Sequence, residues 1–588
     1  MAYMADQTVS MNVGREYTQQ TQRERDIVEM VIALFEQLNQ YRVTFASQWE
    51  EVAEVLAPNQ RNTFYKWSYN FPGMKKTDRQ IDASGMLALN RFGAIVDSLI
   101  TPRNMTWHGL TASNPYVAKQ RGVKLWFETA TQLLFKTRYA PIANFMSQNQ
   151  QNFQSLGAFG NMGMFIDRAV GIRGEPLKAI RYKALPIGEV FIRENHQGLV
   201  DAFVRAWRMT AKQAVAKFGK DRVPQKLLDE AQKQSETVFD FFHCVVPNDE
   251  YDPLSNSHNS TTKKYASYYV SVEGRILLGE GGYNSFPLAY SRYNQAPQEV
   301  YGRGPGMDVL PALKTLNAEK AVFLKAGHRA ADPILLMYDD GALDFNMVPG
   351  AQNKGGVTDD GKPLVHTLPI GNVQINKEMM DEERSLINDE FLVTLFQILT
   401  ETPEMTATEV VERINEKGIL LAPTIGRQQS EYLGPLIDRE LDLMVDMNQL
   451  PPMPPVLQEA RGEYEVVYTS PLSRSQRAQE AAGFLRTIES ALAVSSQMQD
   501  PSQLDSFAFE RAWPAIAEIQ SVPESWMSSP EELNAKRQAR AQAQQQQQQI
   551  QAMPAQAAML KAQATVAKAN GQPTNQQQAQ QTQQQGQM

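Results

Sequence analysis

The chain has 588 residues, of which 42% are hydrophobic, and a formal net charge of −8. This length predicts several domains, and the acidic balance argues against a protein that coats nucleic acid, whose usual footprint is a basic surface. The single cysteine excludes a disulfide within the chain, and no apolar run reaches the roughly 18 residues of a membrane span. The N-terminus lacks the layout of a signal peptide. We therefore expect a soluble product of a reducing compartment, or part of a particle assembled inside a cell.

Helical periodicity dominates the first 160 residues. Apolar side chains at three- and four-residue spacing predict helices over 23–57, 78–99, 115–137 and 143–159. A short strand is expected at 106–110. Gly157, Gly160 and Gly163 stand at three-residue spacing, and because they lack a Cβ we expect another backbone to pack closely against them.

The period changes to alternation after Met164. Short strands separated by turn residues are predicted at 164–167, 179–182, 189–193, 202–207, 237–246 and 265–278. Thr210 is the expected N-cap of a short helix that ends at Phe218. Residues 59–300 are therefore expected to form one mixed α+β domain, preceded by an N-terminal helical segment, 1–58.

The stretch from Tyr301 to Thr400 predicts two long helices joined by an irregular excursion. Glycines at 302, 304 and 306 are interpreted as loose backbone ahead of the first helix, which ends near Ala331 because Pro333 follows. One face of this helix is expected to carry Leu310, Leu313, Asn317, Ala321, Leu324 and His328. The second helix is expected over 377–399, with acidic residues in its first turns, where the helix dipole favours them. One face of it is expected to carry Met380, Ile387, Phe391, Leu395 and Ile398.

The remaining chain is predicted to be mainly helical. A capping box at Thr406–Glu409 begins a helix that continues, with a kink near Gly426, to Met444. We then expect a stiff linker at 451–455, a strand at 464–468 and helices at 473–498 and 506–519. From about Ala535 the chain is rich in Gln and Ala and cannot form a packed core of its own, although both residues favour helix.

No segment carries a complete catalytic or cofactor-binding motif. Residues 356–363 have the glycine and lysine spacing of a phosphate-binding loop, but Pro363 occupies the position that must supply a hydroxyl group. Asp359 and Asp360 would also repel phosphate, so a surface turn is the preferred interpretation. The six histidines are scattered without the spacing of metal ligands. We expect no enzyme activity, no cofactor and no metal.

Charge on the two long helices is a weaker signal. Lys314 and Lys325 are eleven residues apart, about three helical turns, so they share a face. This is either a solvated face or, if many copies surrounded DNA, a pair of rings that touch phosphates without reading sequence. The acidic group that contains Glu378 and Glu382 would form a repulsive ring that lets DNA slide.

Short motifs spread over most of residues 20–520 share their order and spacing with one family. They are Ser98–Pro102, Phe153–Gly160, Leu185–Ile192, Arg208–Gln213, Phe286–Pro287, Glu299–Pro305, Leu310–Asn317 and Met405–Val410. On these motifs the chain resembles the head-to-tail connector, or portal, proteins of short-tailed, podovirus-like tailed bacteriophages. The Gln-rich tail lies outside the resemblance.

The resemblance implies a ring of about twelve identical subunits at one capsid vertex, with a central channel for packaging and ejecting double-stranded DNA. It implies a mainly helical α+β fold of the portal type, with an α+β wing (59–300), two stem helices (301–331 and 377–400) and a clip between them (332–376). A channel loop, a kinked wing helix and a linker with a strand would occupy 401–472, crown helices 473–534, and a disordered or helical tail 535–588. The channel loop facing DNA would include Thr400, Glu401, Glu404 and Thr406.

Partners and location follow from the same resemblance. The clip would meet the terminase large subunit during packaging and tail adaptor or tail tube proteins later. Scaffold protein, the major capsid protein and internal core proteins are further expected contacts, and no membrane is expected. The protein would assemble in the host cytoplasm and remain in the virion at the capsid vertex. The alternative is an enzymatic component of the packaging machinery, an ATPase or nuclease, which would need a complete phosphate loop or a carboxylate metal cluster.

Overall fold

The structure of the chain is a computed structural model. It describes residues 15–65, 73–103, 105–171, 175–233, 236–249, 263–337, 346–368, 373–394, 424–459, 462–468, 482–494, 506–519, 522 and 524–569. The chain divides into two compact units, one ending at Gln520 and the other beginning at Ser521.

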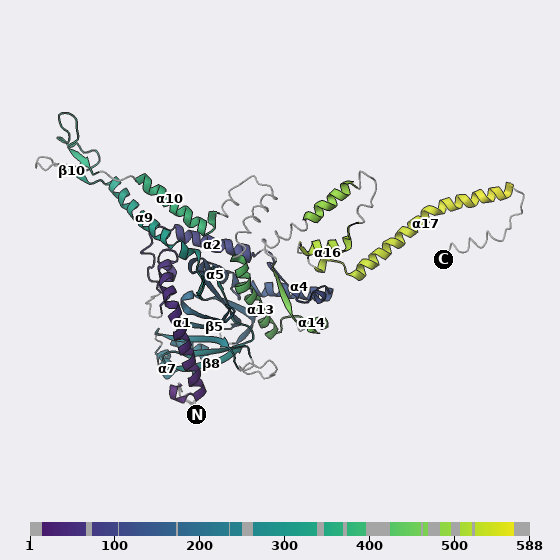
Figure 1. The fold of residues 1–588 in the computed structure, drawn as a ribbon, viewed down its shortest axis with the longest axis horizontal. Coiled ribbons are helices and arrows are strands. Elements are labelled where there is room, and N and C mark those ends of the chain that lie inside the picture. Colours follow the sequence, from purple (N-terminus) through teal and green to yellow (C-terminus); the bar gives the residue numbers. More distant parts are fainter. Residues whose placement is uncertain are drawn as a thin grey trace, which may run out of the picture. The chain divides into compact units, whose positions relative to one another are not determined.

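The long helix α1 (Gln22–Val55) connects two parts of the first unit (Figure 1). It begins at a capping box, in which the Thr21 side chain accepts from the backbone N–H of Glu24 and the Glu24 side chain accepts from the backbone N–H of Thr21. Its N-terminal half packs Val28 and Phe35 against strands of a large sheet. Its C-terminal half carries Trp49 into a second core. The helix predicted over 23–57 is therefore confirmed.

Two antiparallel sheets form the α+β part of this unit. The larger has the order β4-β5-β6-β7-β8, and the smaller has the order β3-β2-β9. Their strands are β2 (Asn161–Val170), β3 (Pro176–Ala184), β4 (Val190–Glu194), β5 (Val200–Thr210), β6 (Val238–Pro247), β7 (Tyr265–Ser271), β8 (Ile276–Tyr283) and β9 (Leu288–Arg292). The prediction of one strand over 265–278 is wrong, because the chain turns before Ile276 with Arg275 at φ 46°. Strand β9 was not predicted.

The first unit also contains helices outside these sheets. They are α2 (Ser84–Ile100), α3 (Pro115–Ala118), α4 (Arg121–Arg138), α5 (Phe145–Phe159), α6 (Ala211–Phe218), α7 (Gln225–Gln232), α13 (Gly434–Asp446), α14 (Pro455–Glu459) and α16 (Phe509–Ile519). Thr210 caps α6 as predicted. The helix expected over 115–137 is split into α3 and α4, and α7 was not predicted. Near Gly426 the chain stays helical and passes through a π-helical turn at Gln429–Leu433, so the predicted kink is a widened turn.

Two further sequence predictions concern the C-terminal half. The strand expected at 464–468 is confirmed as β12 (Tyr464–Tyr468), which pairs antiparallel with β1 (His108–Ala112). Residues 482–494 are helical, in agreement with the helix expected over 473–498. The capping box at Thr406–Glu409 lies outside the described residues.

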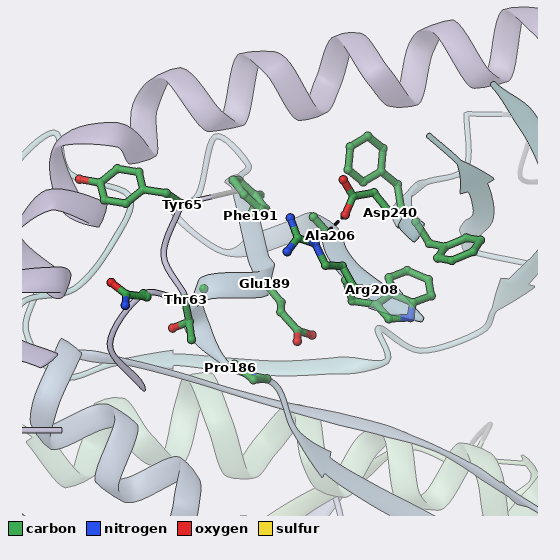
Figure 2. A pocket seen from close by; sticks show the side chains of 13 residues that line it. Thr63, Tyr65, Pro186, Glu189, Phe191, Ala206, Arg208 and Asp240 are labelled. Atoms are coloured by element: carbon green, nitrogen blue, oxygen red, sulfur yellow. Dashed lines mark hydrogen bonds and ion pairs between the residues drawn. The ribbon is translucent and has the colours of Figure 1, made fainter. Parts of the chain in front are cut away.

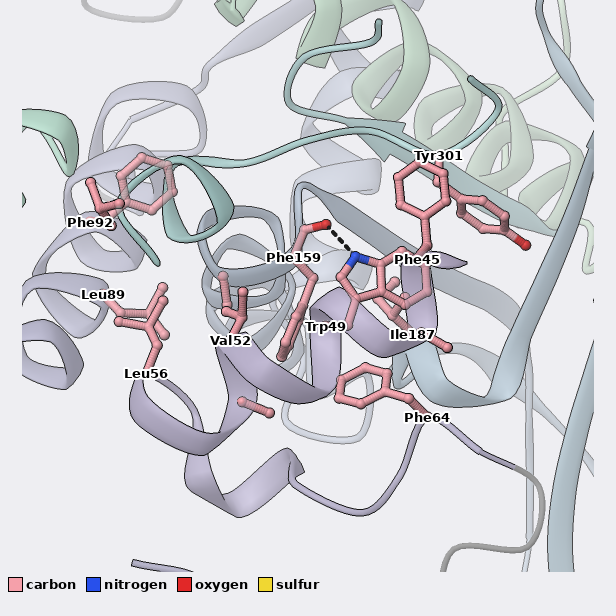
Figure 3. Close-up of a cluster of buried hydrophobic side chains, with 14 of the residues drawn as sticks. Phe45, Trp49, Val52, Leu56, Phe64, Leu89, Phe92, Phe159, Ile187 and Tyr301 are labelled. Atoms are coloured by element: carbon pink, nitrogen blue, oxygen red, sulfur yellow. Dashed lines mark hydrogen bonds between the residues drawn. The ribbon is translucent and has the colours of Figure 1, made fainter. Parts of the chain in front are cut away.

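An aromatic cluster joins α1 to the helices and to the segment after β9 (Figure 3). Trp49 is fully buried and donates its indole N–H to the carbonyl oxygen of Phe159 at 3.2 Å. The Tyr301 ring meets the Trp49 ring edge-on at 5.3 Å between centroids. Burying one such side chain stabilises the fold by about 1.5–3 kcal/mol. This cluster is the core on which the segment beginning at Tyr301 is seated.

Two groups of glycines pack directly against each other beside that cluster. Gly160 ends α5 with φ +70°, and a Cβ added there would lie under 3.0 Å from backbone atoms of Arg303 and Gly304. Added Cβ atoms at Gly302 and Gly304 would likewise lie under 3.0 Å from backbone atoms of Gly160. The predicted close packing at Gly160 is confirmed. The interpretation of residues 302–306 as loose backbone is wrong, because these glycines lie in tight contact with the end of α5.

A buried ion pair connects α4 to α13. Arg138 and Glu440 are both fully buried, and the guanidinium donates to the two carboxylate oxygens at 2.9 and 2.5 Å. The Tyr182 hydroxyl donates to the same carboxylate at 2.5 Å. Burial, with the Arg138 charge beside it, lowers the pKa of His108 well below its ordinary value. His108 is therefore neutral, and its Nε2 accepts from Arg138 at 2.9 Å.

The second unit contains α17 (Pro530–Ala569), a helix of 40 residues. Ser529 and Glu532 form reciprocal hydrogen bonds at its start, at 3.1 and 3.0 Å. The Gln/Ala-rich sequence was compatible with either a disordered or a helical tail. The structure is helical as far as Ala569.

Candidate functional site

The stretch from Tyr301 forms a helical hairpin in the first unit, in which α9 and α10 lie side by side (Figure 1). After the short helix α8 (Pro305–Asp308) come α9 (Leu310–Ala331), the strand pair β10 (Leu335–Met337) and β11 (Val365–Thr367), and α10 (Val373–Glu390). We call α9, α10 and the strands between them the hairpin, and its end at Leu313 and Phe391 the base.

The second helix differs from its predicted limits. It begins at Val373 instead of Lys377, so the acidic residues at 378–383 do not lie in its first turn. It ends at Glu390 instead of Leu399, because Leu392 has φ 61°, a left-handed conformation that cannot continue the helix. Residues Leu395 and Ile398, expected on its apolar face, lie outside the described residues.

The base of the hairpin is part of the aromatic core. Leu313 and Leu316 of α9 and Met380 and Ile387 of α10 are buried in the cluster that contains Trp49. Phe391, just past α10, meets the Phe92 ring edge-on at 5.9 Å between centroids. The expected face of α9 is therefore correct at Leu313, but Leu324 and His328 farther along are exposed.

Polar contacts hold the same end. The Asn317 side chain accepts from the backbone N–H of Ile81 at 2.7 Å and donates to the Arg79 carbonyl oxygen at 2.9 Å. Arg384 of α10 pairs with Asp82 at 2.8 Å. Burial acts to raise the pKa of Asp82, but hydrogen bonds from Ser84 and Arg384 outweigh it, so the pKa lies below its ordinary value. The 79–82 segment thus fixes both helices at their base.

On the sides of α9 and α10 that do not face the core, large apolar side chains are exposed. Val322 is 56% exposed, Met379 49% and Leu386 51%. The segment between the helices adds further exposed apolar residues, namely Ile334, Leu336, Met337, Met347, Val348, Val357, Leu364 and Leu368. A monomer rarely exposes so many large apolar side chains on one projecting element, and such patches usually mark contacts with other proteins.

The residues predicted to face DNA are distributed as follows. Lys314 pairs with Glu51 of α1 at 2.5 Å, so it is not a free cation in the subunit. Lys325, Glu378 and Glu382 are exposed. Four others, namely Thr400, Glu401, Glu404 and Thr406, lie outside the described residues.

The phosphate-loop-like segment at 356–363 forms an exposed turn. The Thr358 backbone N–H donates to the Lys362 carbonyl oxygen at 2.9 Å, and Val357 bridges antiparallel to Pro363. Gly361 takes φ +76°. This geometry confirms the interpretation as a surface turn.

A cavity of about 310 Å³ lies between the segment 62–65 and strands β4, β5 and β6 (Figure 2). Arg208 donates to Asp240 at 2.9 Å across one wall. The other lining carboxylate, Glu189, is held by Arg205 at 2.7 Å. No histidine, lysine or cysteine is among the described residues that line this cavity.

The described part of the chain contains no group of three His, Cys, Asp or Glu side chains placed to hold a metal ion. Its helices include none that is both long and apolar enough to span a bilayer.

The chain matches known proteins over most of its length. Residues 28–527 match the model of the bacteriophage head to tail connecting protein family. The chain is 28% identical over 496 residues to a probable portal protein of Bordetella phage BPP-1, covering 82% of this chain and 85% of that protein. It is 26% identical over 532 residues to a portal protein of Salmonella phage epsilon15, covering 89% and 92% of the two chains. The chain therefore belongs to the bacteriophage head-to-tail connecting protein family.

Proposed function

We propose that this head-to-tail connector assembles into a ring of about twelve subunits at one capsid vertex. The ring encloses a channel through which double-stranded DNA enters during packaging and leaves during ejection. The observation that carries this proposal is the hairpin, which is fixed to the core at its base and exposes apolar side chains such as Val322 and Leu386 beyond it. Contacts between neighbouring subunits in a closed ring would remove these side chains from water.

The proposed parts of the ring are those that the resemblance to portal proteins implies. Helices α9 and α10 form the stem, and the β10–β11 segment within 332–376 forms the clip. The α+β region over 59–300 forms the wing, residues 473–534 the crown, and the channel loop includes Thr400 to Thr406. Lys314 and Lys325 were predicted to face the DNA and to touch its phosphates without base readout, whereas Glu378 and Glu382 were predicted to form a repulsive ring that lets DNA slide.

The clip is the proposed docking surface for other proteins. Its exposed apolar side chains, among them Leu336, Met337 and Met347, suit contacts with the terminase large subunit and then with tail adaptor or tail tube proteins. Scaffold and major capsid protein would meet the ring at the vertex, and internal core proteins would meet it inside the head. The virion is thus the proposed location.

The proposed role is structural. The motif that most resembled a nucleotide site is the exposed turn at Thr358–Lys362, and both carboxylates of the cavity in Figure 2 are paired with arginines. Hydrolysis of ATP during packaging is assigned to the terminase. Turnover by purified rings that is lost in Lys362→Ala would instead support the ATPase alternative.

Native mass spectrometry with negative-stain imaging of the full chain tests the ring. We expect a species of about 0.8 MDa, about twelve copies of the 66.1 kDa chain, with a central hole. A neighbouring ring size would change the copy number alone. A monodisperse monomer, even when scaffold protein is co-expressed, would contradict the proposal.

A further inference from the structure

The two helices of the hairpin carry opposite charge on their outward faces. In α9, positions 318, 322, 325 and 329 fall on one stripe at 3.6 residues per turn, about half a turn away from the buried Leu313 and Leu316. This stripe presents Lys325 and Arg329 together with Val322, and all three are exposed.

The corresponding stripe of α10 is acidic. Positions 378, 382, 385 and 389 share a face that is about half a turn away from the buried Met380 and Ile387. Three of these positions are Glu378, Glu382 and Asp389, and their side chains are exposed. Leu386 and Met379, each about half exposed, lie beside the acidic stripe.

The charged groups far from the base have no partner within the part of the subunit that the structure describes. Near the base, Lys314 pairs with Glu51 and Arg384 pairs with Asp82. Lys325, Arg329, Glu378 and Glu382 form no ion pair or hydrogen bond through their side chains with any described residue. The two stripes are also at the same level, because α9 ends and α10 begins at the end of the hairpin away from the base.

We infer that the basic stripe of α9 in one subunit packs against the acidic stripe of α10 in the next subunit of the ring. The inference rests on the proposed ring and specifies its stem contact. A ring needs a heterologous interface, in which two different surfaces of the same chain meet, and these two stripes are different and complementary. Val322 and Leu386 supply apolar area to that contact. This assigns Lys325, Glu378 and Glu382 to subunit contact instead of the channel wall.

Charge reversal on one stripe at a time tests the contact. The variant with Lys325→Glu and Arg329→Glu has acidic groups on both faces, and the variant with Glu378→Lys and Glu382→Lys has basic groups on both faces. In either variant alone, every neighbour pair brings like charges together, so we expect rings to be lost. In an equal mixture each variant finds its complement on both sides, so we expect rings in which the two alternate.

The fraction of protein in rings is measured by native mass spectrometry, with a tag on one variant to count its copies per ring. Lys354→Glu with Lys362→Glu makes the same change of charge at exposed positions of the clip and should leave the ring fraction unchanged. Far-UV circular dichroism of each variant, expected to match wild type because the altered side chains are exposed, confirms that loss of rings is not loss of fold.

The outcomes distinguish failure of the proposed ring from failure of the proposed contact between the stripes. Wild-type protein without rings would remove the proposed function and this inference with it. Wild-type rings together with normal rings in both variants would overturn only the contact between the stripes. If those variant rings packaged less DNA, the charged residues would instead be assigned to the channel wall. Rings lost in both variants and not restored by mixing would also overturn the pairing of stripes.

Discussion

Arg138 and Glu440 in the body of the first unit are fully buried and paired, whereas Lys325 and Glu382 on the hairpin are exposed and lack ion pairs among the described residues. Apolar side chains show the same contrast. Trp49 in the body is fully buried, whereas Val322 on α9 is 56% exposed. The Arg138–Glu440 pair and the Trp49 ring thus find their partners within one chain. Lys325, Glu382 and Val322 find no such partners among the described residues, and this is the physical basis for proposing that the hairpin forms the subunit contact.

The largest expected effect is on the body. In Glu440→Ala the Arg138 charge stays buried without its carboxylate, and we expect the free energy of unfolding to fall by about 3–5 kcal/mol. Urea denaturation of the purified protein measures this loss. The matched change on the hairpin, Glu378→Ala, removes an exposed carboxylate and should alter stability by less than about 0.5 kcal/mol. Equal effects of the two substitutions would remove the contrast between the regions.

The glycine contact gives the next largest effect. In Gly160→Ala the new Cβ would meet the backbone of Arg303 and Gly304, and the overpacked contact should cost about 1–3 kcal/mol. The control is Gly327→Ala in α9, where an added Cβ meets nothing within 4 Å. That control should stabilise the helix by about 0.5–1 kcal/mol. An unchanged melting temperature in Gly160→Ala would show that the backbone of Arg303 and Gly304 can move to accommodate the added Cβ, and would contradict this prediction.

The Asp82–Arg384 ion pair at the base of the hairpin should make a smaller, pH-dependent contribution to the free energy of unfolding. The pKa of Asp82 is lower in the folded protein, so its contribution is present above the unfolded value of about 3.9 and is lost as pH falls through the folded value. Asp82→Asn should cost at most about 1 kcal/mol at pH 7, because its partner Arg384 is partly exposed. Urea denaturation between pH 7 and pH 3 should show the two proteins converging below about pH 4. A difference that persisted at low pH would exclude the carboxylate as its cause.

The smallest effect on subunit stability is expected on the outward faces of the hairpin. Val322→Ser with Leu386→Ser should change the free energy of unfolding by no more than about 0.5 kcal/mol per site, yet lower the fraction of protein in rings. Thermal unfolding and native mass spectrometry on one sample measure both. Leu316→Ser, on the buried face of α9, is the control and should destabilise the subunit itself. A normal ring fraction in the double variant would show that these apolar faces do not take part in assembly.

Local signals in the sequence predicted local structure well. The Thr210 cap, the helix beginning near Arg23 and the strand at 464–468 depend on side chains within a few residues of one another, and all are confirmed. The end of α10 was missed because nothing in the sequence marks Leu392 for a left-handed conformation. The turn between β7 and β8 was missed for the same reason at Arg275.

Contacts between distant parts of the chain could not be predicted from the sequence. Lys314 was expected on a solvated face or facing DNA, but it pairs with Glu51, which is 263 residues away in the chain. The Arg138–Glu440 pair joins positions separated by 302 residues. The acidic group at 378–383 was visible in the sequence, but its relation to Lys325 depends on the antiparallel pairing of α9 and α10. Arg329 was not identified as a candidate, although its spacing of four residues from Lys325 places both side chains on one face of the predicted helix.

An electron cryo-microscopy reconstruction of the full-length wild-type protein tests the central claim most directly. We predict a closed ring in which the α9–α10 hairpins surround a central channel, with Lys325 and Arg329 of each subunit against Glu378 and Glu382 of its neighbour. Hairpins that point outward from the rim, or rings whose subunits meet without contact between α9 and α10, would contradict it.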